Sequence, residues 1–212
     1  MILRISWQRI LISGLLLAPS AWPAQNAAVT SDDAGQQSAA EQKSSITVHV
    51  YKTGLFSAFA HNHIIVAPIA QSTTDAKRLA AEILVHSKEM RVTDPGDSDS
   101  TRSEIQATML GPKVLDAEKF PEIHFKSSKI EPLRIEPLKA EPPDTQHYRV
   151  TGLLELHGTS KEISFEVTHS PGRYHGSTKL KQTEFGIQPV SIGGGAVKVK
   201  DQIDLDFDVF EN

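Results

Sequence analysis

The sequence contains no cysteine among its 212 residues. Disulfide bonds, catalysis by a thiol and attachment of a lipid to a cysteine are therefore excluded. The sequence also lacks the motifs GxSxG and HExxH, and no glycine-rich loop between a strand and a helix is present to hold a phosphate. The triple glycine at residues 193–195 does not have that context. We therefore expect no enzymatic activity.

Basic residues are not in excess either. The chain has 22 Lys and Arg against 26 Asp and Glu, a formal net charge of -4. Loss of residues 1–24 would remove Arg4 and Arg9 and no acidic residue, which takes this charge from -4 to -6. A protein that binds nucleic acid concentrates basic residues on one face. We therefore expect no nucleic-acid partner.

Long apolar segments are missing after the first residues. Residues 1–24 have the layout of a secretory signal peptide, with Arg4 and Arg9 before an apolar run at residues 10–18 and small residues after it. That run is about half of the ~20 residues that span a bilayer. Residues 25–44 are rich in Ala, Gln, Ser and Asp, which predicts a disordered leader. We expect a soluble periplasmic or secreted protein without a stable membrane anchor.

Residues 45–212 alternate between apolar and polar side chains in the manner of β-strands. The alternation is clearest at residues 46–51 and 203–209, and the aspartates of the second stretch must face water because buried carboxylates are costly. Further strands are predicted at residues 54–68, 79–92, 122–130, 148–157, 162–169 and 174–185, with a tight turn at residues 158–160.

Two segments interrupt this alternation. Residues 101–109 are good helix formers, and Asp99, Ser100 or Thr101 is the expected N-cap. Prolines recur through residues 130–144, which favours an extended hairpin loop over a paired strand. The pattern predicts an all-β fold with one short helix, closed into an eight-stranded antiparallel barrel. The interior of such a barrel either is filled by side chains or holds one small or elongated ligand.

His61 and His63 lie two residues apart in an apolar stretch, which places them on one face of a strand together with Phe59. One interpretation is a metal site, which needs further ligands because zinc takes three or four protein groups. The candidates for those ligands are His49, His124, Glu155 and His157. The other interpretations are a polar contact with a ligand head group near the barrel mouth, or structural hydrogen bonds. For His157 and Lys161 we expect structural or solvated roles.

Two blocks of sequence carry a resemblance to a known family. MLGPKVLDAEKFPEIHFKSSKI at residues 109–130 and GLLELHGTSKEISFEV at residues 152–167 precede FGI at residues 185–187. In this order they resemble the YceI-like family, and AFAHNHII at residues 58–65 resembles its histidine-rich subgroup. The resemblance covers residues 45–212. It implies a lipocalin-like barrel whose lumen holds a polyisoprenoid, an isoprenoid quinone or another long-chain amphiphile.

On this basis we expect a hydrophobic small-molecule partner, no catalytic residue and no cofactor other than a bound isoprenoid or quinone lipid. The barrel is also compatible with a homodimer. The alternative function is a His-dependent metal-binding protein or metalloenzyme centred on His61 and His63. The side chains expected to line the lumen and contact the ligand are Val48, Val50, Phe59, His61, His63, Phe125, Leu154, Leu156, Phe165 and Phe207.

Overall fold

The computed structural model describes residues 43–54, 62–75, 79–134 and 144–211. The chain divides into two units, Met1–Ala39 and Ala40–Asn212. The first unit lies wholly outside the described residues. So do the predicted signal peptide, residues 1–24, and the predicted leader up to residue 42. The described fold therefore belongs to the second unit.

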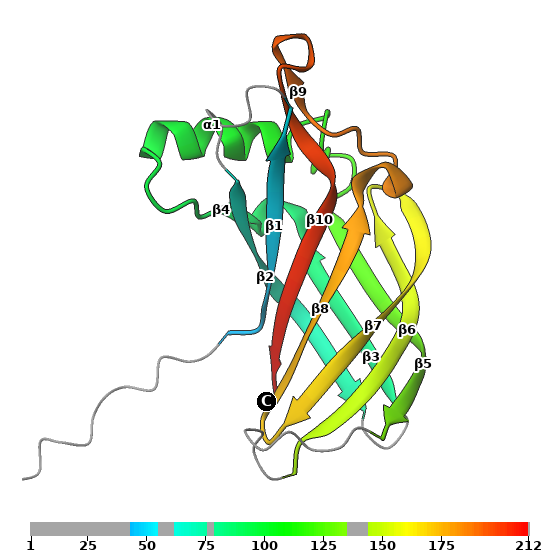
Figure 1. Ribbon diagram of the computed structural model, residues 1–212. Coiled ribbons are helices and arrows are strands. Elements are labelled where there is room, and N and C mark those ends of the chain that lie inside the picture. Colours follow the sequence, from blue (N-terminus) through cyan, green and yellow to red (C-terminus); the bar gives the residue numbers. More distant parts are fainter. Residues whose placement is uncertain (1–42, 55–61, 76–78, 135–143, 212) are drawn as a thin grey trace, which may run out of the picture. The chain divides into compact units, whose positions relative to one another are not determined.

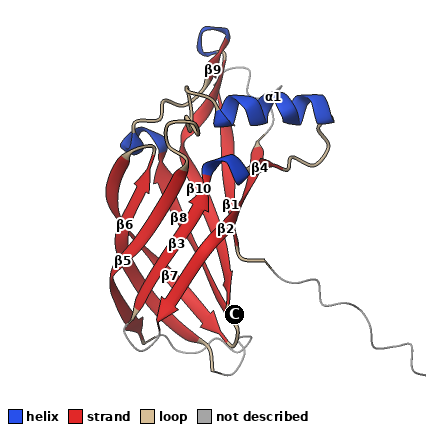
Figure 2. Ribbon diagram, turned by 180° about the vertical axis from the view of Figure 1, so that it is seen from behind, coloured by secondary structure: helices blue, strands red, loops and turns tan. Residues whose placement is uncertain are grey.

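Eight strands form a closed antiparallel barrel, as the sequence predicts (Figures 1 and 2). Around the barrel they follow the order β1, β10, β8, β7, β6, β5, β3, β2, and pairing of β1 with β2 closes the ring. The short strands β4 (Arg91–Val92) and β9 (Ser191–Ile192) pair with β2 and β10. The eight barrel strands are β1 (Ser45–Thr53), β2 (His63–Asp75), β3 (Ala80–His86), β5 (Glu122–Leu133), β6 (Gln146–Leu156), β7 (Thr159–Ser170), β8 (Arg173–Lys181) and β10 (Val197–Phe210).

Among the described residues there is one α-helix, α1 (Asp99–Leu110), which lies at one end of the barrel, and the C-terminus lies near the other end (Figure 1). Ser98 is its N-cap, because the Ser98 hydroxyl accepts a hydrogen bond from the Thr101 amide at 3.1 Å. The helix begins two residues before the predicted start at residue 101, and its N-cap is Ser98 and not Asp99, Ser100 or Thr101. None of the helices in the described part of the chain has the length and apolar character that crossing a membrane requires.

The predicted strand at residues 79–92 is divided by a 3₁₀ helix, η2 (Ser87–Glu89). Ser87 is buried, its amide donates to the Pro121 carbonyl at 2.8 Å, and its hydroxyl donates to the Phe120 carbonyl at 2.9 Å. These bonds to a distant segment turn the chain after β3. Similarly, β8 ends at Lys181 and a second 3₁₀ helix, η3 (Gln182–Phe185), occupies the rest of the strand predicted at residues 174–185.

Three other predicted boundaries were wrong. The strand expected from residue 54 begins at His63, with residues 55–61 outside the described part of the chain. β5 continues to Leu133, and Pro132 pairs with Tyr148 although a loop was expected there. Pro132 is tolerated because β3 pairs with β5 only as far as Lys126, so β5 is an edge strand at this point.

The third concerns the turn between β6 and β7. It consists of His157 and Gly158, and both have positive φ, 52° and 71°. Two positive φ angles are typical of the type I′ turn that joins two strands closely. Thr159 and Ser160 already pair with β6, so the turn is shorter than residues 158–160.

The aspartates of β10 lie on the outer face of the barrel, as predicted. Asp206 is half exposed, and its Oδ2 lies 3.0 Å from His49 Nε2 on β1. Asp208 accepts a hydrogen bond from Arg173 Nε at 2.7 Å on β8. Side chains from both neighbouring strands therefore pair with this acidic row, while the alternate positions of β10 face the interior.

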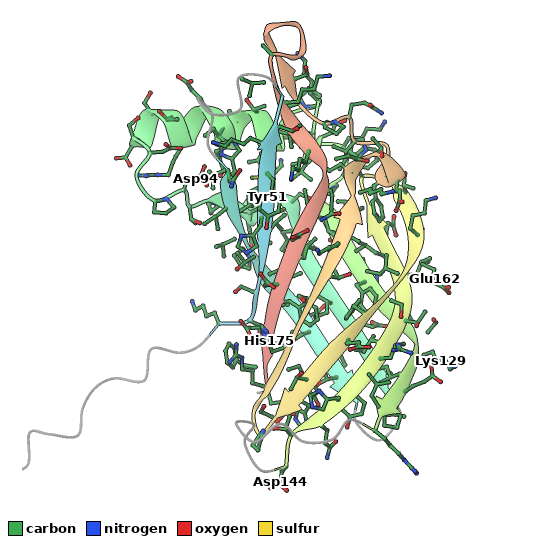
Figure 3. All side chains as sticks on the ribbon, in the orientation of Figure 1. Tyr51, Asp94, Lys129, Asp144, Glu162 and His175 are labelled. Atoms are coloured by element: carbon green, nitrogen blue, oxygen red, sulfur yellow. The ribbon has the colours of Figure 1, made fainter. Side chains whose placement is uncertain are left out.

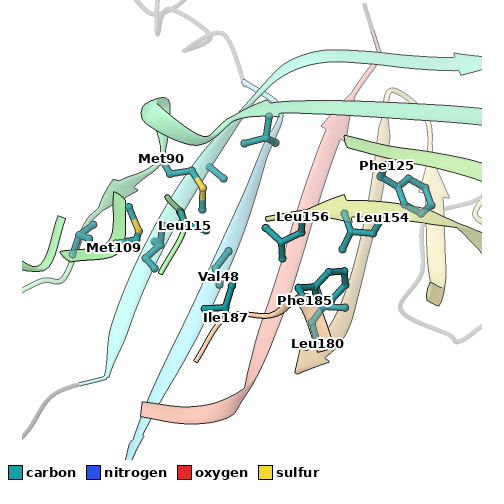
Figure 4. Close-up of a cluster of buried hydrophobic side chains, with 14 of the residues drawn as sticks. Val48, Met90, Met109, Leu115, Phe125, Leu154, Leu156, Leu180, Phe185 and Ile187 are labelled. Carbon is teal, nitrogen blue, oxygen red and sulfur yellow. The ribbon is translucent and has the colours of Figure 1, made fainter. Parts of the chain in front are cut away.

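The hydrophobic core extends from the barrel interior to the end that carries α1 (Figure 4). There, side chains from α1 and the turns around it pack against the strands. Phe185, in η3, is the most deeply buried large side chain, at 1% exposure. The buried residues labelled at this end include Met90, Met109, Leu115, Phe185 and Ile187.

Candidate functional site

The barrel lumen contains two neighbouring cavities. The larger, about 500 Å³, lies toward α1 and is walled mainly by apolar side chains of β1, β2, β10 and α1. The smaller, about 160 Å³, lies toward the opposite end, among residues of β5 to β8 and β10. Both cavities are lined by Ile46, Leu154, Leu180 and Leu205, so the two spaces adjoin inside the barrel. A volume of about 500 Å³ is in the range that takes a drug-sized ligand.

Each predicted lumen residue within the described part of the chain lines one of these cavities. Three line the smaller cavity, four line the larger cavity, and Leu154 lines both. Phe59 and His61 lie outside the described residues. Contact of the predicted lumen side chains with a ligand stays a prediction. The smaller cavity has Phe125, Phe165 and Phe207, and the larger cavity has Val48, Val50, His63 and Leu156.

Three phenylalanine rings form a row across the smaller cavity. The centroid of Phe165 lies 5.3 Å from that of Phe125 and 5.2 Å from that of Phe207, in tilted and edge-to-face geometry. Such pairs are favourable because the positive edge of one ring meets the negative face of another. The row forms an apolar wall.

Two glycines make room for the outer rings of this row. A Cβ atom on Gly176 would lie 2.4 Å from Phe207 Cζ and 2.6 Å from the Glu166 carbonyl oxygen. A Cβ atom on Gly152 would lie 2.6 Å from Phe125 Cζ. The absence of a side chain at these strand positions allows the rings to lie directly against the backbone.

The polar part of the larger cavity centres on His63, at the start of β2. Its Nδ1 lies 2.6 Å from Oδ2 of Asp94, whose other oxygen accepts a hydrogen bond from the Ile64 amide at 2.6 Å. The Asp94 side chain is only 4% exposed, whereas that of His63 is 25% exposed and lines the cavity. Figure 3 shows Asp94 close to α1, at the opposite end of the barrel from Asp144. A paired, buried carboxylate thus orients an imidazole at the wall of the lumen.

The structure brings His63 together with Asp94 and Asp97, and ligand atoms of these three residues lie within 4.8 Å of one another. The metal ligands suggested from the sequence lie elsewhere. His49 contacts Asp206 on the outer face, and His124 is the cross-strand neighbour of Glu155. Sequence reasoning missed both aspartates, although they lie in the acidic loop DPGDSDS at residues 94–100.

His157 has the structural role expected for it. Its ring nitrogen Nδ1 lies 3.2 Å from the Phe185 carbonyl oxygen, and its ring packs against Phe120 with centroids 4.6 Å apart. These contacts tie the β6 to β7 turn to η3 at the end of the barrel. His157 does not line either cavity.

Tyr174 and Tyr148 line the smaller cavity. Burial raises the pKa of the Tyr174 phenol, and a hydrogen bond to the Glu211 carboxylate raises this pKa further. The phenol therefore stays neutral and acts as a hydrogen-bond donor. Largely apolar walls with a polar side chain such as His63 suit an amphiphilic ligand.

The fold is shared with a solved structure, and two further structures are similar to the chain at lower TM-scores. The crystal structure of Burkholderia cenocepacia BcnA is 17% identical, with a TM-score of 0.51, over 80% of this chain and 96% of that chain. A polyisoprenoid binding domain from Saccharophagus degradans implicated in plant cell wall breakdown is 12% identical, with a TM-score of 0.48, over 79% and 92%. The Campylobacter jejuni YCEI protein is 15% identical, with a TM-score of 0.47, over 70% and 80%.

Among curated proteins, none matches this chain. The family model described as YceI-like domain matches residues 37–210, which contain every described strand of the barrel. The match confirms the resemblance seen in the two sequence blocks at residues 109–130 and 152–167. The chain therefore belongs to the YceI-like family.

Proposed function

We propose that this protein is an exported lipid-binding protein that holds a polyisoprenoid, an isoprenoid quinone or another long-chain amphiphile in its barrel. The observation that carries this proposal is the apolar cavity of about 500 Å³, which adjoins a second cavity along the lumen. An elongated apolar chain fits adjoining apolar spaces better than a compact polar ligand does. The ligand class is the one named for the Saccharophagus degradans domain.

The burial of a hydrocarbon chain supplies enough free energy for useful affinity. Each buried methylene group contributes roughly 0.8 kcal/mol, so ten of them contribute about 8 kcal/mol before ordering costs. That amount corresponds to an affinity of about 1 μM. The proposal requires no catalytic group, and the lumen residues supply binding surface alone.

The proposal includes export. Residues 1–24 would direct the chain out of the cytoplasm and be removed, leaving a protein in the periplasm or outside the cell without a stable membrane anchor. N-terminal sequencing of the mature protein tests this part: a chain that begins between residues 21 and 25 supports it, and retention of Met1 contradicts it.

Native mass spectrometry after gentle purification tests the ligand. We expect the intact protein to carry an additional mass that organic solvent extracts and that fragments as a prenyl or long-chain lipid. A protein that is persistently empty, and that also fails to take up added quinone or prenyl alcohol, contradicts the proposal. The same spectra report whether the barrel is a monomer or a homodimer.

A second candidate function is metal binding, which the grouping of His63, Asp94 and Asp97 favours. Elemental analysis of the purified protein distinguishes it from the first candidate. A stoichiometric transition metal that is lost in His63→Ala would support this function. Absence of metal, with unchanged metal affinity in His63→Ala and in a His61→Ala/His63→Ala double variant, would exclude it.

A further inference from the structure

The hydrogen bonds of Asp94 determine which nitrogen of His63 carries the proton. Asp94 Oδ1 accepts from the Ile64 amide at 2.6 Å, and Oδ2 lies 2.6 Å from His63 Nδ1. A carboxylate can only accept hydrogen bonds, so we assign a proton to Nδ1. In the neutral imidazole the other nitrogen, Nε2, then has a free lone pair and accepts a hydrogen bond.

Asp94 is itself held firmly, so this arrangement does not depend on a mobile side chain. Its carbonyl oxygen accepts from Arg102 Nη1 at 3.3 Å, and the neighbouring Thr93 amide donates to the Ile64 carbonyl at 2.9 Å. The carboxylate side chain is 4% exposed. The loop before α1 is therefore tied to β2 at His63 and Ile64.

From this geometry we infer that the barrel selects amphiphiles whose head group donates a hydrogen bond to His63 Nε2. The inference rests on the proposed lipid-binding function and specifies the head group. Prenols, prenylated phenols and quinols have such a hydroxyl, whereas the corresponding ethers and quinones offer only acceptors. The His63 side chain is 25% exposed and lines the apolar lumen, so a bound ligand without a donor would displace water from Nε2 and leave this acceptor unpaired.

The charges around His63 favour a neutral head group. Asp94 contacts the imidazole directly, and Asp97 has a carboxylate oxygen close to it. The same cavity is also lined by Glu104 on α1 and by three lysines, the half-buried Lys52 on β1 and the solvent-exposed Lys181 and Lys198 on β8 and β10. The charged groups gathered at the imidazole itself are the carboxylates of Asp94 and Asp97. A hydroxyl therefore suits the surroundings of His63 better than a carboxylate does.

The test compares two ligands with the same tail, geranylgeraniol and its methyl ether, at about pH 8.5, where imidazoles are ordinarily neutral. A chelator is present, so that a bound metal cannot account for the result. We expect the wild-type protein to bind the alcohol about tenfold more tightly than the ether, the ratio expected for one buried hydrogen bond.

Two variants examine the origin of this preference. In Asp94→Asn the amide can still accept from Ile64 while donating to Nδ1, which moves the imidazole proton to Nε2. The ether can then accept from Nε2, and we expect the two ligands to bind within about twofold of each other. His63→Phe removes the acceptor and should give the same result. His175→Phe is the matched control, because His175 pairs with Asp208 at 3.0 Å on the outer face; it should keep the preference.

The outcomes separate this inference from the function on which it rests. Tight binding of both ligands to the wild-type protein, within about twofold, overturns the head-group inference but leaves lipid binding intact. If the protein binds neither ligand, the head-group inference and the proposed lipid-binding function are both contradicted. Full preference retained in a folded Asp94→Asn or in His63→Phe contradicts the assigned role of the pair, and if Asp94→Asn does not fold, His63→Phe decides.

Discussion

His63 Nδ1 and Asp94 Oδ2 lie 2.6 Å apart, although 31 residues separate them in the sequence. The bond joins the first residue of β2 to the loop that leads into α1. It therefore connects the barrel wall to the helix at its end, and it places a polar group beside an otherwise apolar lumen. We expect both stability and ligand selection to depend on this pair.

Asp94→Ala should destabilise the fold by about 2 kcal/mol, because the Ile64 amide and the His63 Nδ1 proton lose a charged acceptor. Chemical denaturation measures the change. The control is Asp206→Ala, which removes a half-exposed partner of His49 and should cost less than about 1 kcal/mol. Equal losses in the two variants would show that the Asp94 contacts stabilise the fold no more than the half-exposed Asp206–His49 pair does.

Gly176→Ala should destabilise the barrel by about 1–3 kcal/mol, because its Cβ atom meets the Phe207 ring at 2.4 Å and a backbone oxygen at 2.6 Å. Thermal unfolding followed by circular dichroism measures this loss. Ser177→Ala, at the next position and exposed on the outer face, should leave the melting temperature nearly unchanged. A Gly176→Ala variant as stable as Ser177→Ala would mean that the ring of Phe207 moves at no cost.

Asp201 stabilises the fold only at pH values at which its carboxylate is ionised. Hydrogen bonds from the Thr183 amide at 2.8 Å and the Thr183 hydroxyl at 2.7 Å to the carboxylate hold the pKa of Asp201 below 3.8, the amide contributing most. A group whose folded pKa is lowered adds stability that is complete above the unfolded pKa and disappears as the pH falls through the folded pKa.

The expected result is that wild-type protein melts at a higher temperature than Asp201→Asn at about pH 7, and that this gap narrows below about pH 3.8. Thr183→Val provides the control, because it keeps the amide donor and should reduce the gap only in part. A gap that stays constant from neutral to acidic pH is incompatible with a lowered pKa.

The barrel could be predicted from sequence because its strands have one apolar and one polar face. Residues 203–209 alternate without exception, and the structure places their aspartates outside and their apolar side chains toward the lumen. Contacts between distant segments were not predictable in the same way. Ser87 turns the chain at η2 because it bonds to Phe120 and Pro121, and no periodicity in residues 79–92 signals those partners.

The lining of the lumen was predictable for the same reason, but its polar contact was not. His63 could be placed on a strand face from its spacing. Asp94 lies in a loop whose composition indicates only exposure and turns, yet it is one of the most deeply buried polar residues described. Its burial follows from the closure of the loop over β2, a relationship that local sequence does not encode.

Two neighbouring leucines of β6 test whether a lipid occupies the lumen. Leu154 lines both cavities and is 8% exposed, whereas Leu153 is 50% exposed on the outer face. Tryptophan at position 154 should fill space that the ligand needs, and tryptophan at position 153 should not.

The decisive measurement is the amount of extractable lipid per folded protein in wild type, Leu153→Trp and Leu154→Trp, with melting temperatures recorded to confirm that each is folded. We expect wild type and Leu153→Trp to carry lipid in equal amounts and Leu154→Trp to lose most of it. Equal lipid content in all three folded proteins would contradict binding inside the barrel.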